Sequence, residues 1–120
     1  MGNKKEHLSK AEHNNSFLFT FDFNKTKYLD WAVVSIFYTA LHYIDAYLAK
    51  IGLEEFQNHG TRHRLVEKHI PLILKEYRIL YRQSLSARYH VNYETTAINV
   101  RLYNDKFLFR IKTEILSLLK

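Results

Sequence analysis

Apolar residues recur three or four positions apart along most of the chain, which is the period of a helix with one buried face. This pattern predicts helices over about residues 4–20, 28–51, 61–69 and 71–88, and a last helix from 95 or 96 to the C-terminus. Phenylalanines alternate from Phe17 to Phe23 as in a strand, but a lone strand would lack a pairing partner. We therefore interpret them as a helix end followed by an extended, packed connection.

The segment 28–51 is the most apolar part of the chain and has a boundary signal at each end. Thr26 is a candidate N-cap, and Gly52 can adopt the left-handed conformation that often follows a helix. One face collects large apolar residues at helical spacing: Trp31, Val34, Phe37, Leu41, Ile44 and Leu48. Because nearly every side of this helix is apolar, we expect it at the centre of an antiparallel up-down bundle of four to five helices.

A second stripe on the same helix is polar, with Ser35, Thr39, His42 and Asp45 also spaced three or four apart. Such groups need partners, because each unpaired buried polar atom costs about 1–3 kcal/mol. Asp45 can orient the imidazole of His42, which makes both of them candidate ligand-binding residues. In the simpler alternative, the hydroxyls bond to the preceding turn and His42 is satisfied within the core.

The other helices have weaker boundary signals. Thr61 is a candidate cap for the third helix and Thr95 or Thr96 for the last, and Pro71 predicts a break between the third and fourth. Residues 53–60 are then a loop, and residues 88–94 a connection. The expected core positions are Leu8, Ala11, Asn15 and Leu18 in the first helix, Ile73, Tyr77, Leu80, Ser84 and Ala87 in the fourth, and Leu108, Ile111, Ile115 and Leu118 in the last.

Composition favours a single all-α domain over residues 1–120. Three glycines and one proline leave little room for the tight turns of a β protein, and the chain is long enough to bury a core without cross-links. Cysteine is absent and the N-terminus lacks the apolar run of a signal peptide, so we expect a soluble, cytoplasmic protein without a membrane partner.

Positive charge is concentrated in one part of the chain. The net charge is +6, and between residues 59 and 88 seven Lys and Arg stand against two Glu. The segment HGTRHR adds His59, Arg62, His63 and Arg64 at a predicted helix start, where free N–H groups and the helix dipole favour anions. We expect these residues to bind a phosphate or nucleotide. The alternative is a solvated helix end.

A metal site at the same segment has less support. His59 and His63 have the spacing of metal ligands on a helix, but His59 precedes the expected cap and no neighbouring Cys or Glu completes a ligand set. The sequence therefore predicts neither a metal nor a cofactor.

The fourth helix combines an outward basic row with aromatic residues at its end. Lys75, Arg78 and Arg82 form the row, which leads to Arg88, Tyr89 and His90. Cations neutralise phosphates and aromatic rings stack on bases, so this composition suits single-stranded RNA, with Tyr89 as the stacking residue. The alternative is an ordinary solvated face. Standard hydrolase classes lack support, because no Gly-rich phosphate loop, nucleophile elbow or HExxH motif occurs.

Four segments occur in a characteristic order: AEHN at 11–14, DWAVVSIFYTALHYIDAYLAKIG at 30–52, NHGTRH at 58–63 and LYRQSLSARY at 80–89. Together they resemble the HEPN domain family of prokaryotic helical proteins, over nearly the whole chain. The resemblance implies a four- or five-helix up-down bundle, usually dimeric, of the kind found among nucleotide-binding and RNA-cleaving modules of toxin–antitoxin, defence and stress systems.

Catalytic members of that family carry an Arg, four to six further residues and a His near the fourth helix, and this chain departs from the pattern. Seven residues separate Arg82 from His90, and the family spacing occurs instead before His69, on the third helix. Metal-independent RNA cleavage needs a base for the 2′-hydroxyl proton and a cation for the charged phosphorane. Arg82, Arg88 and His90 are therefore candidate catalytic residues that a dimer interface can bring together.

The sequence thus predicts a small HEPN-like module, a homodimer, that binds a nucleotide or RNA through the basic surface of its third and fourth helices. Two alternatives stay open. One is a metal-independent HEPN endoribonuclease of the toxin or defence type. The other is a non-catalytic partner-binding or dimerisation module, for instance a companion of a nucleotidyltransferase or an antitoxin.

Overall fold

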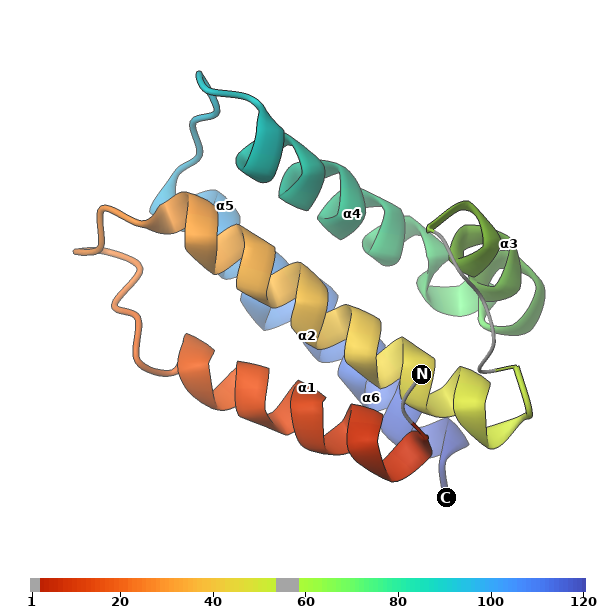
Figure 1. The fold of residues 1–120 in the computed structure, drawn as a ribbon. Coiled ribbons are helices and arrows are strands. Elements are labelled where there is room, and N and C mark those ends of the chain that lie inside the picture. Colours follow the sequence, from red (N-terminus) through yellow and green to blue (C-terminus); the bar gives the residue numbers. More distant parts are fainter. Residues whose placement is uncertain (1–2, 54–58) are drawn as a thin grey trace.

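The computed structural model describes residues 3–53 and 59–120, and over these ranges the elements are all helical (Figure 1). The helices are α1 (Lys4–Leu18), α2 (Leu29–Lys50), α3 (His59–His69), α4 (Leu74–Tyr89), α5 (Ala97–Leu102) and α6 (Phe109–Leu118). A short 3-10 turn, Pro71–Ile73, precedes α4, and a π-helical stretch, Tyr103–Leu108, joins α5 to α6. The all-α prediction is confirmed. Because α5, the π-helical stretch and α6 are continuous, the described chain has the expected five helical segments.

The long helix α2 lies in the middle of the bundle. Figure 1 shows α1 and α4 along its sides, the C-terminal segment behind it and α3 at one end. The predicted core residues from Val34 to Leu48 are buried, and each large apolar side chain contributes about 1.5–3 kcal/mol by leaving water. Length and composition alone would let α2 span a membrane, but 72% of its apolar window is buried against the rest of the bundle.

Trp31 is an exception on this helix. We expect it on the buried face, but 58% of it is exposed. Ala32 and Val33 form the inner side of the same turn and are buried. Adjacent residues on an α-helix point about 100° apart. Because Ala32 and Val33 point toward the core, Trp31 faces outward.

The predicted C-terminal end of α2 is confirmed, whereas its predicted N-cap is wrong. Gly52 has a φ of 82°, the left-handed conformation expected after a helix. Thr26, however, does not cap the helix, because the N-cap position is Tyr28 and has no side-chain cap bond. The hydroxyl oxygen of Thr26 instead accepts a hydrogen bond from the Tyr28 N–H at 3.1 Å, which stabilises the turn before the helix.

The predicted start of α3 needs the same correction. The helix already includes His59 and Gly60, so these two residues do not belong to a loop and Thr61 lies inside the helix. Residues 54–58, the rest of the predicted loop, lie outside the described residues. The break at Pro71 is confirmed, and Thr96 caps α5 as predicted by accepting a hydrogen bond from the Asn99 N–H at 3.1 Å.

The connection after α1 turns instead of extending. The N–H groups of Thr20 and Phe21 donate to the carbonyls of Phe17 and Leu18, and the Phe21 ring packs edge-on against Phe17 at 5.0 Å. The aromatic packing was expected, whereas the extended backbone was wrong. A turn pairs backbone groups that an isolated strand would leave without partners.

The C-terminal segment changes register once. Its buried residues are Val100, Tyr103, Leu108, Ile111 and Ile115, with a gap of five between Tyr103 and Leu108. A π-helical turn, with hydrogen bonds from residue i to i+5, absorbs this gap and returns Leu108 to the buried face. Leu108, Ile111 and Ile115 are therefore core residues as predicted, while Leu118 is half-buried.

Candidate functional site

A buried ion pair joins α2 to α3. Nε of Arg62 donates to Oδ1 of Asp45 at 2.9 Å, and Nη2 donates to Oδ2 at 3.2 Å. The Asp45 side chain is 3% exposed and that of Arg62 is 12% exposed. Burial raises the pKa of Asp45 above its ordinary value, while the hydrogen bonds and charge of Arg62 oppose that rise. This two-pronged contact fixes α3 against the centre of the bundle.

His59 extends this ion pair along α3. Its Nδ1 lies 3.0 Å from Nη1 of Arg62. Because a guanidinium can only donate, Nδ1 of His59 must accept, which requires an imidazole without a proton on that nitrogen. Burial, and then the positive charges of Arg62, Arg88 and His63, lower the pKa of His59. We call Asp45, Arg62 and His59 the buried polar line.

Aromatic rings support His59 and His63 of α3. The Tyr81 ring contacts both, with centroids 5.1 Å from His59 and 4.6 Å from His63. Tyr77 meets His63 at 4.9 Å, and Phe37 of α2 lies beneath Tyr77 and Tyr81 at 6.1 and 5.7 Å. Burial raises the pKa of Tyr77, so its hydroxyl stays protonated. The rings hold the imidazoles in place.

Guanidinium groups of α4 face these histidines. Burial, and then the positive charges of Arg78, Arg62 and Arg82, lower the pKa of His63. At the other end of the helix, Nη1 of Arg88 donates to the Tyr38 hydroxyl at 2.8 Å. We call His59, His63, Arg78, Arg82 and Arg88 the basic seam. The first four lie along α3 and the adjoining part of α4, and Arg88 extends the group toward the C-terminal end of α4, where its charge still acts on His59.

Other predicted site residues lie at the edges of this region. Arg64 is exposed and its Nη2 lies 3.4 Å from the Thr61 hydroxyl, inside α3 and not at the predicted helix start. Tyr89 is 70% exposed, with the Arg88 guanidinium 5.3 Å from its ring centre. His90 follows the end of α4, and no hydrogen bond or ring contact joins its side chain to Arg82 or Arg88 within the described residues. Within the single chain these interactions do not link the three candidate catalytic residues, and their meeting across a dimer interface stays a prediction.

His42 has a different partner from the expected one. Its Nδ1 lies 3.1 Å from Nδ1 of His7 on α1, while the Asp45 carboxylate is engaged with Arg62. Burial, and then the positive charges of His7, Lys10 and Arg62, lower the pKa of His42 to about 4, so its imidazole is neutral at pH 7. The simpler alternative holds for Thr39, whose hydroxyl donates to the Ser35 carbonyl at 2.7 Å.

Sequence reasoning missed four residues of this region: His7, Tyr38, Tyr77 as a ring partner, and Tyr81. A signal for His7 was present, because it lies four residues before Ala11 and so shares the expected core face of α1. Tyr81 likewise follows Tyr77 by one turn of α4. Only the packing of α1, α3 and α4 with α2 gives these residues their partners.

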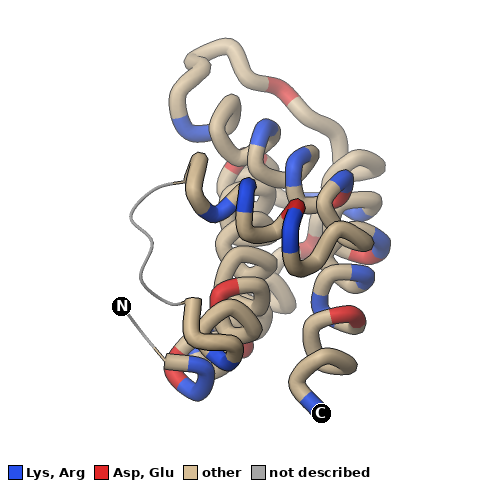
Figure 2. Tube along the Cα trace, turned by 90° about the vertical axis from the view of Figure 1, so that its right-hand side faces the viewer, with Lys and Arg blue, Asp and Glu red and all other residues tan. Residues whose placement is uncertain are grey.

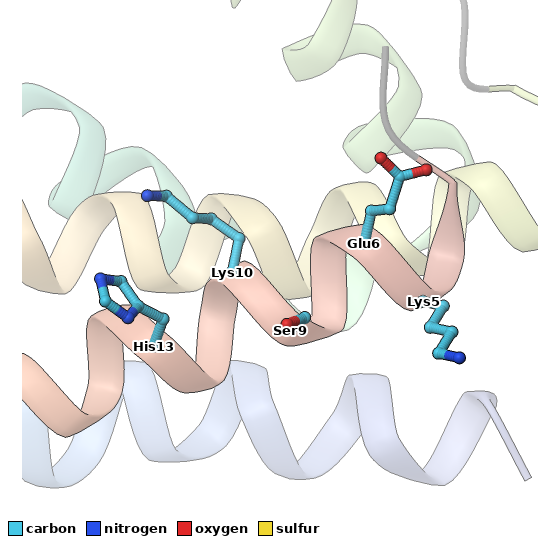
Figure 3. Close-up of a pocket in the computed structure, with 5 residues that line it drawn as sticks. All are labelled: Lys5, Glu6, Ser9, Lys10 and His13. Carbon is cyan, nitrogen blue, oxygen red and sulfur yellow. The ribbon is translucent and has the colours of Figure 1, made fainter.

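A wide, open surface depression lies elsewhere, on α1. Its lining residues are Lys5, Glu6, Ser9, Lys10 and His13. Figure 3 shows that all five come from this one helix and that their side chains point in several directions. Because no second element contributes a wall, we assign no binding role to it.

Comparisons of the chain with protein-family models, with curated proteins and with solved structures find no match. The resemblance to the HEPN family therefore stays a prediction. The function has to be inferred from the chemistry of the site.

Proposed function

We propose that this chain is a HEPN-like helical module that binds RNA or a nucleotide through phosphate groups at the basic seam. The observation that carries the proposal is the pair of exposed guanidinium groups, Arg78 and Arg82, on the part of α4 beside α3, where Arg78 meets Glu67 of α3 at 3.7 Å. The positive charges of Arg78 and Arg82 act on His63, and that of Arg88 acts on His59. Such a concentration of positive charge attracts phosphate.

The charges on the outside of this region are available to a ligand. Figure 2, in which the side of the molecule that carries α3 faces the viewer, shows more Lys and Arg than Asp and Glu positions there. Arg78 pairs with Glu67 at 3.7 Å, but both side chains are exposed, at 45 and 63%. An exposed pair contributes only about 0–1 kcal/mol, so a phosphate can replace the Glu67 carboxylate.

The spacing along α4 favours an oligonucleotide over a single nucleotide. Lys75, Arg78, Arg82 and Tyr89 are three, four and seven residues apart, so they share one face of the helix. Arg82 and Tyr89 lie about 10 Å apart along the axis, roughly three stacked base steps of 3.4 Å. A single strand can therefore place a phosphate at Arg82 and stack a base on the exposed Tyr89 ring.

Arg62 has a positioning role in this proposal. The sequence suggests that it contacts phosphate, but its Nε, Nη1 and Nη2 are engaged with Asp45 and His59. We therefore assign the phosphate contacts to Arg78 and Arg82. Arg88 can add only its Nη2, because its Nε donates to the Ser84 carbonyl and its Nη1 to the Tyr38 hydroxyl. Arg62 holds His59 and α3 in place beneath these contacts.

The test compares two double variants that remove the same charge. Arg78→Ala with Arg82→Ala removes part of the basic seam, whereas Lys4→Ala with Lys5→Ala removes two exposed cations of α1. Binding of a labelled single-stranded RNA is measured by fluorescence anisotropy over a salt series. In the α4 variant we expect at least about a tenfold loss at low salt, and a salt slope shallower by about 0.7 per lost phosphate contact.

Three outcomes have separate meanings. Unchanged affinity in the α4 variant contradicts the proposal, and an equal loss in both variants shows that only net charge matters. If a mononucleotide binds as tightly as the RNA, the ligand of the basic seam is a nucleotide and not an RNA strand. Cleavage of the RNA in EDTA, abolished by His90→Ala, would support the ribonuclease alternative instead. The homodimer and the protein partner stay predictions.

A further inference from the structure

Two histidines that are distant in the sequence face each other inside the bundle. Nδ1 of His7 on α1 lies 3.1 Å from Nδ1 of His42 on α2, and the ring centroids are 5.3 Å apart. His7 is 8% exposed, and its Nε2 is buried without a hydrogen-bond partner within the described residues. Two facing imidazole nitrogens form one hydrogen bond only when one of them carries a proton. The described protein groups therefore leave Nε2 of His7 as the unsatisfied atom of this pair.

A carboxylate lies beside the two rings. Asp45 follows His42 by three residues and so lies on the same side of α2. The donor atoms that His7, His42 and Asp45 offer lie no more than 4.8 Å from one another. Two imidazole nitrogens and one carboxylate oxygen from two helices thus form a compact donor set.

We propose that His7, His42 and Asp45 form a binding site for a divalent transition-metal ion, with zinc as the ion that fits best. In a tetrahedral zinc site with Zn–N bonds of about 2.0–2.1 Å, two imidazole nitrogens lie about 3.3 Å apart. The two Nδ1 atoms already lie at 3.1 Å. Mg²⁺ and Ca²⁺ prefer all-oxygen sites, whereas imidazole and carboxylate together suit zinc.

The carboxylate has to move only a short way. An oxygen that is as much as 4.8 Å from an imidazole nitrogen must approach by about 1.5 Å to share a four-coordinate ion, which requires small adjustments of the Asp45 and imidazole side chains together. Three protein ligands leave a fourth position for water.

Arg62 supports the carboxylate from its outer side. Each carboxylate oxygen has two acceptor positions, so Asp45 can keep its bonds to Arg62 and still bind a metal ion. Such an outer partner orients a metal-binding carboxylate. Its positive charge also repels the ion, so we expect an affinity below that of a closed structural zinc site.

This set differs from His59 and His63, the pair with metal-ligand spacing for which the sequence predicted no metal. Nδ1 of His59 is engaged with Arg62, and the rings of His59 and His63 both pack on Tyr81. The sequence predicted no metal site at His42 because the second imidazole comes from α1, 35 residues earlier. Folding brings the two together.

The test uses tag-free protein and cobalt as a visible probe for zinc. We expect one Co²⁺ per chain, with the absorption bands of a four-coordinate site, and displacement by Zn²⁺. His7→Gln and His42→Gln should each weaken binding at least about tenfold, since each removes a direct ligand. His13→Gln is the matched control, because His13 is exposed on the same helix as His7 and should leave binding unchanged.

Circular dichroism of each variant checks that the helices are intact. If a variant does not fold, the wild-type protein still gives an answer, because Zn²⁺ should shift the imidazole NMR signals of His7 and His42 before those of the other histidines. Absence of these shifts and of the cobalt bands would overturn the proposal. So would cobalt binding that both glutamine variants retain. RNA binding has no part in the experiment, so its outcome is independent of the proposed function.

Discussion

Arg62 and Arg82 lie on neighbouring helices and carry the same group, yet their surroundings are opposite. Arg62 is 12% exposed, and three of its nitrogens contact Asp45 and His59. Arg82 is exposed and makes no hydrogen bond or ion pair within the described residues. The buried polar line and the outer face of α4 thus use arginine in two different ways.

The difference follows from the dielectric surroundings of the charge. A buried charge interacts strongly with its partner, and losing that partner leaves it unsolvated, so it specifies how helices are assembled. An exposed charge is screened and contributes little to folding, and it remains available to a ligand. We therefore expect substitutions in the buried polar line to change stability and substitutions on α4 to change binding.

The largest effect is expected for Asp45→Ala. This change leaves the Arg62 guanidinium buried without its carboxylate, which should lower the free energy of unfolding by about 3–5 kcal/mol. Urea unfolding followed by circular dichroism measures the change. Glu67→Ala is the control, because it breaks the exposed pair with Arg78 and should cost at most about 1 kcal/mol. Equal losses of unfolding free energy in the two variants would contradict the distinction between the buried and the exposed ion pair.

A smaller effect is expected from the buried imidazoles when the pH falls. The pKa of His42 is about 4 in the folded chain, against an ordinary value of 6.5. Between these values the unfolded chain binds more protons, so stability is complete above pH 6.5 and decreases as the pH falls toward 4. His59 and His63 add to this, because their pKa values are lowered too.

Because His42 is half-buried, solvent screening limits its share of the loss to about 1–2 kcal/mol. Urea unfolding in the presence of EDTA, repeated across this pH interval, gives the measurement. His42→Gln should make the decrease shallower, whereas His13→Gln, on the exposed side of α1, should not change it. An identical pH profile in wild type and His42→Gln would contradict the assigned pKa shift.

The smallest effect on stability is expected for Arg82→Ala. Its side chain has no partner to lose among the described residues, so the free energy of unfolding should stay within about 0.5 kcal/mol of the wild type. The same variant should weaken RNA binding and reduce its salt dependence. A loss of stability above about 1 kcal/mol would show that Arg82 stabilises the fold, as Arg62 does.

The sequence by itself determined the helices and their faces. Apolar periodicity marked α2 as the central helix, Gly52 and Thr96 marked helix boundaries, and the outward position of Lys75, Arg78 and Arg82 followed from the period of α4. These features depend on local geometry, in which residues three or four apart share a face whatever lies opposite. The register change in the C-terminal segment was not predicted, because an α-helical period was assumed throughout.

Only the tertiary structure decided which groups meet across the helices. The pattern showed that His42 and Asp45 needed partners, but not that α1 supplies His7 to the first and α3 supplies Arg62 to the second. Periodicity gives the direction of a side chain around its own axis, whereas its partner depends on how far each neighbouring helix slides and rotates when the core packs. Both the basic seam and the candidate metal site exist because of that packing.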